Sequence, residues 1–262
     1  MRFQSLVLAL FAAVVALAAS ATALCPHEAA ASGLRSHRVL AAAFGVHSTA
    51  EDFNANTGKG EHRYGLDMVT PLDASHMSCL KAHGYDFVIP RGHRSTGVID
   101  NNYIATVQAA RAAGLNYTGV YHFPCPTCPM SAAAQVQQLV TSFKQNNAMP
   151  DMLWLDVEGT QYWLKNDAKN QQWFTDYFAA AVASGVPFGV YSNHREWTSI
   201  FGSLTFTVPG LPSHPLWYAR YNYLPTPYDY TAFGGWVKPN MKQYLDNKSL
   251  CAVEMDMNVF YQ

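Results

Sequence analysis

From Tyr64 to the C-terminus, short runs rich in β-branched and aromatic residues alternate with longer stretches that suit helices. The predicted strands are Tyr64–Val69, Phe87–Pro90, Tyr117–Phe123, Leu153–Val157, Phe188–Tyr191, Leu216–Tyr221, Lys242–Leu245 and Val253–Val259. The predicted helices are Ala74–His83, Asn102–Ala113, Ala132–Asn146 and Asn170–Ser184. Glycine follows three of them, at positions 84, 114 and 185, and it is the usual residue at a left-handed helix end.

Alternation of strands with helices predicts parallel βαβ units and therefore the α/β class. Eight predicted strands favour a barrel over an open sheet. The sequence contains no GxGxxG motif after the first predicted strand and no GxxxxGK[ST] motif, which disfavours nucleotide-binding open sheets. The last three predicted strands have no full-length helices between them, so we expect an irregular, TIM-like barrel that forms one catalytic domain.

The first residues predict a secretory signal at 1–23. Arg2 precedes the uncharged apolar run Leu6–Ala19, and Ala21-Thr22-Ala23 suits a cleavage site. Residues 24–63 are rich in Ala, His and Ser, and we interpret them as an N-terminal extension or propeptide before a barrel domain at 64–262. We expect a secreted protein, or one in a lysosomal or phagosomal lumen, without membrane attachment after signal cleavage.

Composition narrows the function classes. Hydrophobic residues make up 49% of the chain and charged residues 13%, which excludes a disordered chain. The net charge is −1, so the chain has no overall attraction for nucleic acid. Aromatic residues make up 13%, which favours stacking on cyclic ligands as well as a large core. We expect a monomer.

Four of the five cysteines, at positions 79, 125, 128 and 251, lie in the predicted barrel, and the fifth is Cys25. In an oxidising compartment we expect disulfides among Cys79, Cys125, Cys128 and Cys251, with one cysteine left over; the sequence does not select among the fifteen arrangements. The Cys125-Pro-Thr-Cys128 motif could be a redox or zinc motif. We favour a structural disulfide loop, because there is no second CxxC motif and three prolines surround it.

Acidic residues recur where predicted strands end, and chemistry in parallel barrels takes place at that edge. Asp156 and Glu158 are two residues apart at the end of the fourth strand and should face the same side. Asp67 lies in the first strand and Asp256 in the last. Two carboxyl groups in a cavity of low dielectric constant repel, so one keeps its proton, as glycosidic bond cleavage requires. The alternative for each acid is an ion pair or a capping role in a loop.

Six short motifs in order support a family resemblance. They are Gly65-Leu-Asp67, Tyr121-His-Phe123, Trp154-Leu-Asp-Val-Glu158, Gly189-Val-Tyr191-Ser192, Leu216-Trp-Tyr-Ala219 and Met255-Asp-Met-Asn-Val-Phe260. The chain from Tyr64 onward resembles glycoside hydrolase family 25, the Chalaropsis-type lysozymes. The segments Phe123–Cys128, Gln161–Trp163 and Phe233–Pro239 look closer to its amoeba and nematode branch.

The resemblance implies a (βα)5β3 barrel that hydrolyses β-1,4 bonds between N-acetylmuramic acid and N-acetylglucosamine in bacterial peptidoglycan, for digestion or defence. Glu158 resembles the family's general acid, and Asp156, Asp67 and Asp256 match its other acids. The first-strand motif continues as Met68-Val-Thr-Pro71, which departs from the family pattern.

Further residues are candidates for substrate binding. Aromatic faces stack on sugar rings, and Arg91 could meet anionic wall polymer. The candidates are Tyr121, Tyr191, Trp217, Tyr218 and Arg91, and only one of the adjacent pair Trp217 and Tyr218 can face the barrel mouth. Packing within the barrel is the alternative for each aromatic residue.

Three other functions compete with a peptidoglycan hydrolase. The chain could be a catalytically inactive wall-binding or carbohydrate-binding barrel, a chitin-directed glycosidase, or an immune or storage protein with the same fold. A metal-dependent deacetylase would need a His pair beside an Asp, and the sequence shows no such set. We expect no metal and no cofactor.

Overall fold

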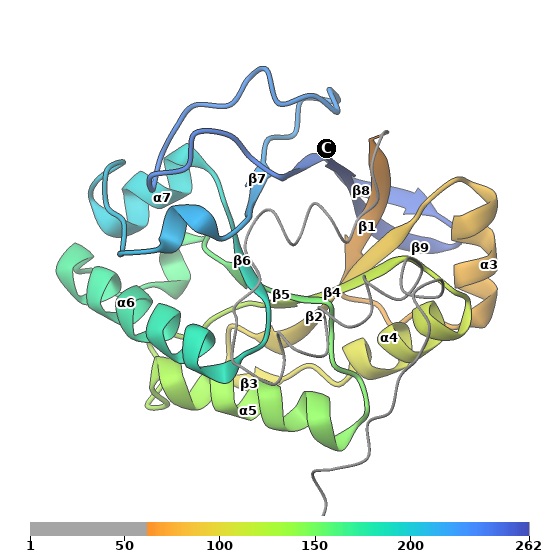
Figure 1. Cartoon of the computed structure of the whole chain (residues 1–262), viewed down its shortest axis with the longest axis horizontal. Coiled ribbons are helices and arrows are strands. Elements are labelled where there is room, and N and C mark those ends of the chain that lie inside the picture. Colours follow the sequence, from red (N-terminus) through yellow and green to blue (C-terminus); the bar gives the residue numbers. More distant parts are fainter. Residues whose placement is uncertain (1–61, 262) are drawn as a thin grey trace, which may run out of the picture. The chain divides into compact units, whose positions relative to one another are not determined.

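The computed structural model describes residues 62–261 (Figure 1). The predicted signal at 1–23, Cys25 and nearly all of the predicted extension lie outside the described residues. Arg63, which we assigned to the extension, is the first residue of strand β1. None of the helices in the described part combines the length and apolar content that crossing a membrane requires.

The described residues form the predicted α/β barrel. Its strands are β1 (Arg63–Met68), β2 (Phe87–Arg94), β4 (Tyr117–His122), β5 (Met152–Asp156), β6 (Phe188–Ser192), β7 (Leu216–Ala219), β8 (Met241–Leu250) and β9 (Val253–Phe260). Pairing of β1 with both β2 and β9 closes the ring of eight strands, and the short strand β3 (Val98–Ile99) adds to β2 outside it. Within the ring, all pairs among β1, β2 and β4–β8 are parallel, whereas β9 is antiparallel to both of its neighbours; β3, outside the ring, is antiparallel to β2.

Helices cover most of the outside of the ring (Figure 1). They are α3 (Ala74–Ala82), α4 (Asn102–Ala112), α5 (Ala132–Gln145), α6 (Asp167–Ser184) and α7 (His194–Phe201), with short 3-10 turns at Thr160–Tyr162 and Leu211–Ser213. The first four agree with the predicted helices, whereas α7 was not predicted. Residues 220–240, all of which are described, contain no α-helix, so the predicted five βα units followed by three strands are confirmed.

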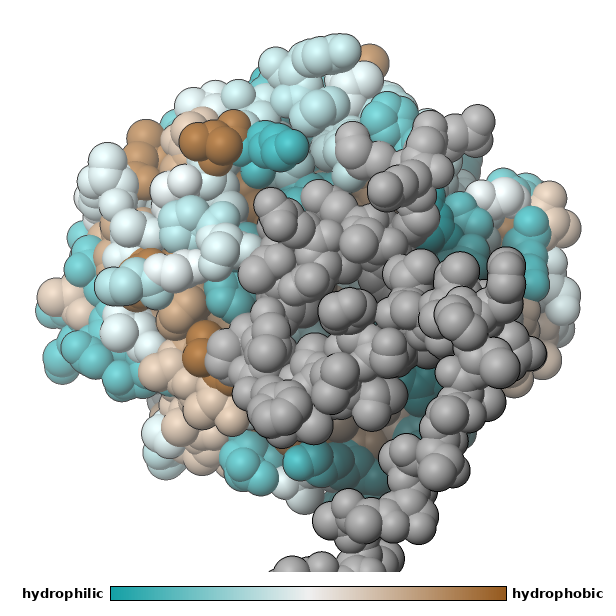
Figure 2. Space-filling view, viewed as in Figure 1, coloured by the Kyte–Doolittle hydropathy of each residue, from teal (hydrophilic) through white to brown (hydrophobic). Residues whose placement is uncertain are grey.

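Alternate side chains of the strands point into the barrel and out toward the helices, which gives one inner apolar layer and an outer apolar layer between strands and helices. The inner layer is mainly aromatic, and it includes Trp154, Trp217 and Phe260. Glycines make room for these rings: a Cβ atom at Gly65 would lie 2.2 Å from the Phe87 ring, and one at Gly189 would lie 2.5 Å from Trp154. The outer layers pack the helices onto the ring. The outer surface seen in Figure 2 is mostly hydrophilic or neutral with scattered hydrophobic residues, as in ordinary globular domains.

The described residues contain two disulfides, which use the four cysteines predicted for them. Cys125 pairs with Cys128, which confirms the structural loop, and Cys79 of α3 pairs with Cys251. Cys251 and Ala252 form the turn between β8 and β9, and both have positive φ angles, of 52° and 65°. Such turns favour Asn and Gly, so the bond to α3 holds a turn that its own sequence does not favour.

The two disulfides should differ in their contribution to stability. Cys79 and Cys251 are 172 residues apart and Cys125 and Cys128 only three, so the first bond restricts the unfolded chain far more. Replacing Cys79 and Cys251 by Ser should lower the free energy of unfolding by about 5 kcal/mol, and replacing Cys125 and Cys128 by about 2 kcal/mol. Urea unfolding of both double variants measures this. Equal losses, or a larger loss for the short loop, would contradict the explanation by chain entropy.

Candidate active site

A cavity of about 140 Å³ lies at the carboxyl ends of the barrel strands and contains all four predicted acids. It is lined by Asp67, Arg91, Tyr121, Phe123, Asp156, Glu158, Tyr191, Trp217, Tyr221, Gln243 and Asp256. A larger, open depression of about 500 Å³ lies over α5, but it is lined by no ionisable side chain. Of these two hollows, the smaller one is therefore the candidate active site.

Asp156 and Glu158 enter the cavity from the end of β5. The backbone stays extended beyond the strand, because the Val157 amide donates to the Tyr191 carbonyl at 2.8 Å and the Ser192 hydroxyl donates to the Val157 carbonyl at 2.8 Å. Val157 packs in the outer layer, so its two neighbours face inward, as the alternation predicted. One carboxylate oxygen of Asp156, Oδ1, is buried without a hydrogen-bond partner among the described residues.

The turn after Glu158 is fixed by two hydrogen bonds. Gly159 has a φ of 66°, and its amide donates to Oε2 of Glu196 at 3.0 Å. The indole of Trp163 donates to the Glu158 carbonyl at 3.0 Å. Glu196, in the first turn of α7, also pairs with Arg195 at 3.2 Å. Glu196 was missed in the sequence because α7 was not predicted, and nothing in the spacing connects it to Glu158.

Asp67 and Asp256 lie directly opposite each other where β1 pairs with β9. The Gln243 amide nitrogen bridges them, donating to Asp67 Oδ1 at 2.8 Å and to Asp256 Oδ2 at 3.2 Å. Asn258 donates a second hydrogen bond to Asp67 Oδ1 at 2.8 Å. Two neutral amides thus hold together two acids that would otherwise repel.

Aromatic donors fix the orientation of both amides. The Tyr191 and Tyr221 hydroxyls donate to Gln243 Oε1 at 2.6 and 2.8 Å, and the Trp217 indole donates to Asn258 Oδ1 at 2.8 Å. Each amide therefore presents its nitrogen to the acids. Gln243, Asn258 and Tyr221 were not predicted as site residues. The only indication of them in the sequence was their position in the strand alternation, which turns them toward the inside of the barrel.

The acids share a raised affinity for protons. Burial raises the pKa of Glu158 to about 7, and the charges of Glu196 and Asp256 contribute. Burial, then the charges of Glu158, Asp67 and Glu196, raises the pKa of Asp156 well above its ordinary value. Burial and Asp256 raise the pKa of Asp67 against the opposing effect of its two amide hydrogen bonds, and burial raises the pKa of Asp256. The cluster can therefore hold protonated and ionised carboxyl groups side by side near neutral pH.

The predicted binding residues divide between two places. Tyr121, Tyr191, Trp217 and Arg91 line the cavity, and the Arg91 guanidinium also pairs with the buried Asp100 at 2.8 Å. Tyr218 does not line it. It belongs to the outer layer, where its ring packs edge-on against Tyr230 at 5.2 Å. Trp217 is therefore the member of the adjacent pair that faces the mouth, and we leave Tyr218 out of the site.

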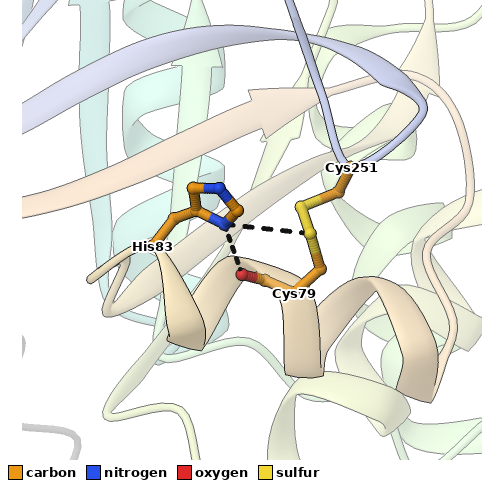
Figure 3. Close-up of side chains that lie close together, drawn as sticks. All are labelled: Cys79, His83 and Cys251. Atoms are coloured by element: carbon orange, nitrogen blue, oxygen red, sulfur yellow. Dashed lines mark hydrogen bonds between the residues drawn. A yellow bond between two sulfur atoms is a disulfide. The ribbon is translucent and has the colours of Figure 1, made fainter.

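One group of potential metal ligands occurs among the described residues, formed by Cys79, His83 and Cys251 (Figure 3). The two sulfur atoms are joined in the disulfide, and His83 Nδ1 lies 2.8 Å from the Cys79 carbonyl. A disulfide has no thiolate to offer a metal, so this group is a structural link between α3 and the β8–β9 turn.

The buried Asp156 should reduce stability at neutral pH. The pKa of Asp156 is higher in the folded state than in the unfolded state. The protonated side chain therefore costs no stability below the unfolded pKa, and the free energy of unfolding falls as the pH rises from the unfolded pKa toward the folded pKa. Asp156→Asn should raise the free energy of unfolding at neutral pH by roughly 1–3 kcal/mol. The gain should shrink as the pH falls toward about pH 3, below the unfolded pKa of about 3.9, where the carboxyl group is mostly protonated in both states. Urea unfolding at both pH values measures this, and a gain that does not depend on pH would contradict it.

Comparisons with known proteins agree with the site. A family model described as Lysozyme-like protein 1 matches residues 56–244. The chain is 39% identical over 194 residues to "Probable GH family 25 lysozyme 2" of Dictyostelium discoideum, covering 74% of this chain and 89% of that protein. It is 36% identical over 199 residues to "Lysozyme-like protein 5" of Caenorhabditis elegans, covering 75% and 90%.

The fold matches solved structures as well. A family GH25 lysozyme from Aspergillus fumigatus superposes with a TM-score of 0.60 at 22% identity, covering 77% of this chain and 95% of that one. The family model spans well over half of the 262 residues, and the relatives align over most of their own length. The chain therefore belongs to the glycoside hydrolase family 25 lysozymes.

Proposed function

We propose that this protein hydrolyses the β-1,4 bond between N-acetylmuramic acid and N-acetylglucosamine in bacterial peptidoglycan. The observation that carries the proposal is the pairing of Glu158, whose pKa is raised to about 7, with three further acids in one cavity at the barrel mouth. Glycosidic bond cleavage requires an acid that still holds its proton beside a carboxylate that has lost its own.

Glu158 is the general acid. It is less buried than Asp156, and its raised pKa keeps a proton available for the leaving oxygen at mildly acidic pH. The Trp163 indole donates to the Glu158 carbonyl, and the Gly159 amide donates to Glu196, so both hydrogen bonds fix the peptide group that directly follows Glu158. Such positioning accounts for much of the efficiency of a proton donor.

Asp156 and Asp67 stabilise developing positive charge or orient the acetamido group or water; each acts as a carboxylate only after it has released its proton, because burial raises the pKa of both. The unpartnered Oδ1 of Asp156 can accept a hydrogen bond from an acetamido N–H group or from water. Asp67 is held by Gln243 and Asn258, which favour its ionised form. Asp256 completes the cluster, and Tyr121, Tyr191, Trp217 and Arg91 line the space for the sugar.

We place this activity outside the cytosol, in secretions or in a lysosomal or phagosomal lumen, where the protein would serve bacterial digestion or defence. Two disulfides support an oxidising compartment. A general acid with a pKa of about 7 is almost fully protonated in an acidic lumen. We expect the protein to act as a monomer.

Loss of the general acid gives the direct test. Glu158→Gln keeps the shape of the side chain but has no acidic proton, so reducing-end release from purified peptidoglycan should fall roughly 10²–10⁴-fold. The wild type should lose activity as the pH rises through about 7, because Glu158 must be protonated to act. The measurement is reducing-end release from about pH 4 to about pH 8, with identification of the new sugar ends.

New muramic acid ends released by the wild type alone would establish the activity. Near-full activity of Glu158→Gln would show that another group is the acid. Wall binding without release by either protein would favour an inactive carbohydrate-binding barrel, and preferential release from chitin would favour a chitin-directed glycosidase.

Glu196 should set the alkaline limit of activity. Its charge raises the pKa of Glu158, so Glu196→Gln should lower that pKa and move the alkaline limb of the pH profile down by up to about one pH unit. The Gln oxygen can still accept the hydrogen bond from Gly159, which makes this variant a test of charge alone. Glu196→Ala removes the hydrogen bond too and should also lower the rate at the optimum. An unchanged alkaline limb in Glu196→Gln would contradict this role.

A further inference from the structure

The cavity is too small for the substrate that the reaction requires. Any glycosidic bond that is cut has a sugar on each side, whereas the volume here is about 140 Å³. Pockets that enclose small ligands usually measure roughly 300–1,000 Å³. At least part of a glycan strand must therefore lie on the surface around the mouth, and the β7–β8 connection provides an unusual surface there.

Three tyrosines of this connection are exposed to solvent. Tyr221, Tyr223 and Tyr228 are 47%, 74% and 94% exposed, and Leu224 between them is 55% exposed. Tyr221 links this surface to the cavity, since its hydroxyl donates to Gln243 while much of its ring remains accessible. Grouped exposed apolar side chains mark interaction sites more often than scattered ones do.

The segment 220–229, which carries these tyrosines, is held by one buried cation, the ammonium group of Lys242. Lys242 of β8 is completely buried, and its ammonium group donates to both carboxylate oxygens of Asp229, at 2.8 and 2.9 Å. It also donates to the Thr226 carbonyl at 3.0 Å and to the Asn222 side-chain oxygen at 3.1 Å. Arg220 pairs with the same Asp229 at 3.1 Å. The segment 220–229 is thus wrapped around a charge whose hydrogen bonds are satisfied.

This arrangement fixes a backbone that the sequence alone would not favour. Tyr223 has a φ of 63°, an outlying conformation for a bulky side chain, and its amide donates to the Tyr244 carbonyl at 3.0 Å. Backbone strain of this kind is found preferentially at functional sites. The buried ion pair therefore holds in place rings that themselves contribute little to the core.

We propose that the segment 221–228 is a binding platform for N-acetylated sugar units of the glycan strand that lie beyond the cavity. The rings of Tyr221, Tyr223 and Tyr228 are its stacking surfaces, and Lys242 with Asp229 is its anchor. Rigid aromatic rings bind with little loss of conformational entropy, and their hydroxyls reach sugar hydroxyls. The proposal rests on the proposed function, since it assigns the platform to the same glycan.

Binding of strands of different length tests the platform. In the Glu158→Gln background, Tyr223→Asn and Tyr228→Ala each remove one ring; Asn tolerates the left-handed backbone at position 223. Each should weaken the Kd for long, peptide-free strands of alternating N-acetylglucosamine and N-acetylmuramic acid roughly 3- to 10-fold. Binding of the single disaccharide, which reaches only the cavity, should not change. Calorimetry with both probes measures this.

Tyr223→Phe and Tyr228→Phe are the matched controls, because they keep the ring and should bind long strands within about twofold of the parent. Unchanged binding of long strands after loss of both rings would overturn the proposal, as would equal weakening for the disaccharide. If the wild type cleaves peptidoglycan but the ring variants bind long strands as tightly as the parent, the platform is refuted and the proposed hydrolase is not. If the ring variants bind long strands more weakly but the disaccharide normally, and the wild type cleaves no peptidoglycan, the proposed hydrolase is refuted and the platform is supported.

Discussion

Closure of the barrel places Asp67 and Asp256 opposite each other, and the rest of the cavity depends on holding these two acids together. β1 meets β9 in an antiparallel pair, so this register is part of the fold and cannot shift without turning the side chains of β9 over. Gln243 and Asn258 bridge the acids, and three aromatic donors orient the two amides. The aromatic interior of the barrel thus supports the acids as well as filling space.

Much of the fold followed from the sequence, because short runs of β-branched and aromatic residues alternate with longer helix-forming stretches between Tyr64 and Ser184, and glycines mark three helix ends. The helix α7 was missed: it has only eight residues and follows directly on β6. β8 extends to Leu250, well past the predicted Leu245, because the hairpin with β9 leaves the barrel and packs near α3. That packing joins residues far apart in the chain through apolar contacts and the Cys79–Cys251 disulfide, which no local pattern indicates.

The site was predictable where chemistry and alternation coincided. Asp156 and Glu158 are separated by one residue on a strand, so a common direction followed from geometry. Alternation turned Gln243 and Asn258 inward, but a neutral amide does not by itself indicate a catalytic site, and Glu196 contacts the turn after Glu158 from a helix that is remote in sequence. Tyr218 shows the limit of residue type as evidence. It is as aromatic as its neighbour Trp217, yet the alternation of the strand turns it to the outer layer.

Two buried ionisable side chains, Lys242 of β8 and Asp156 of β5, show two different treatments of buried charge in this molecule. Lys242 faces outward and has all its hydrogen bonds satisfied, so its burial gives a rigid segment at the rim. Asp156 faces the cavity and keeps an oxygen without a partner, so its burial leaves an unsatisfied acceptor where a substrate must bind. A polar group that is buried and unpaired costs stability. Costs of this kind persist mainly at functional sites, where a ligand can supply the missing hydrogen-bond partner. The two groups therefore have different roles. Lys242 holds the surface segment proposed to bind the glycan, whereas Asp156 offers a free acceptor to the reacting part of the substrate.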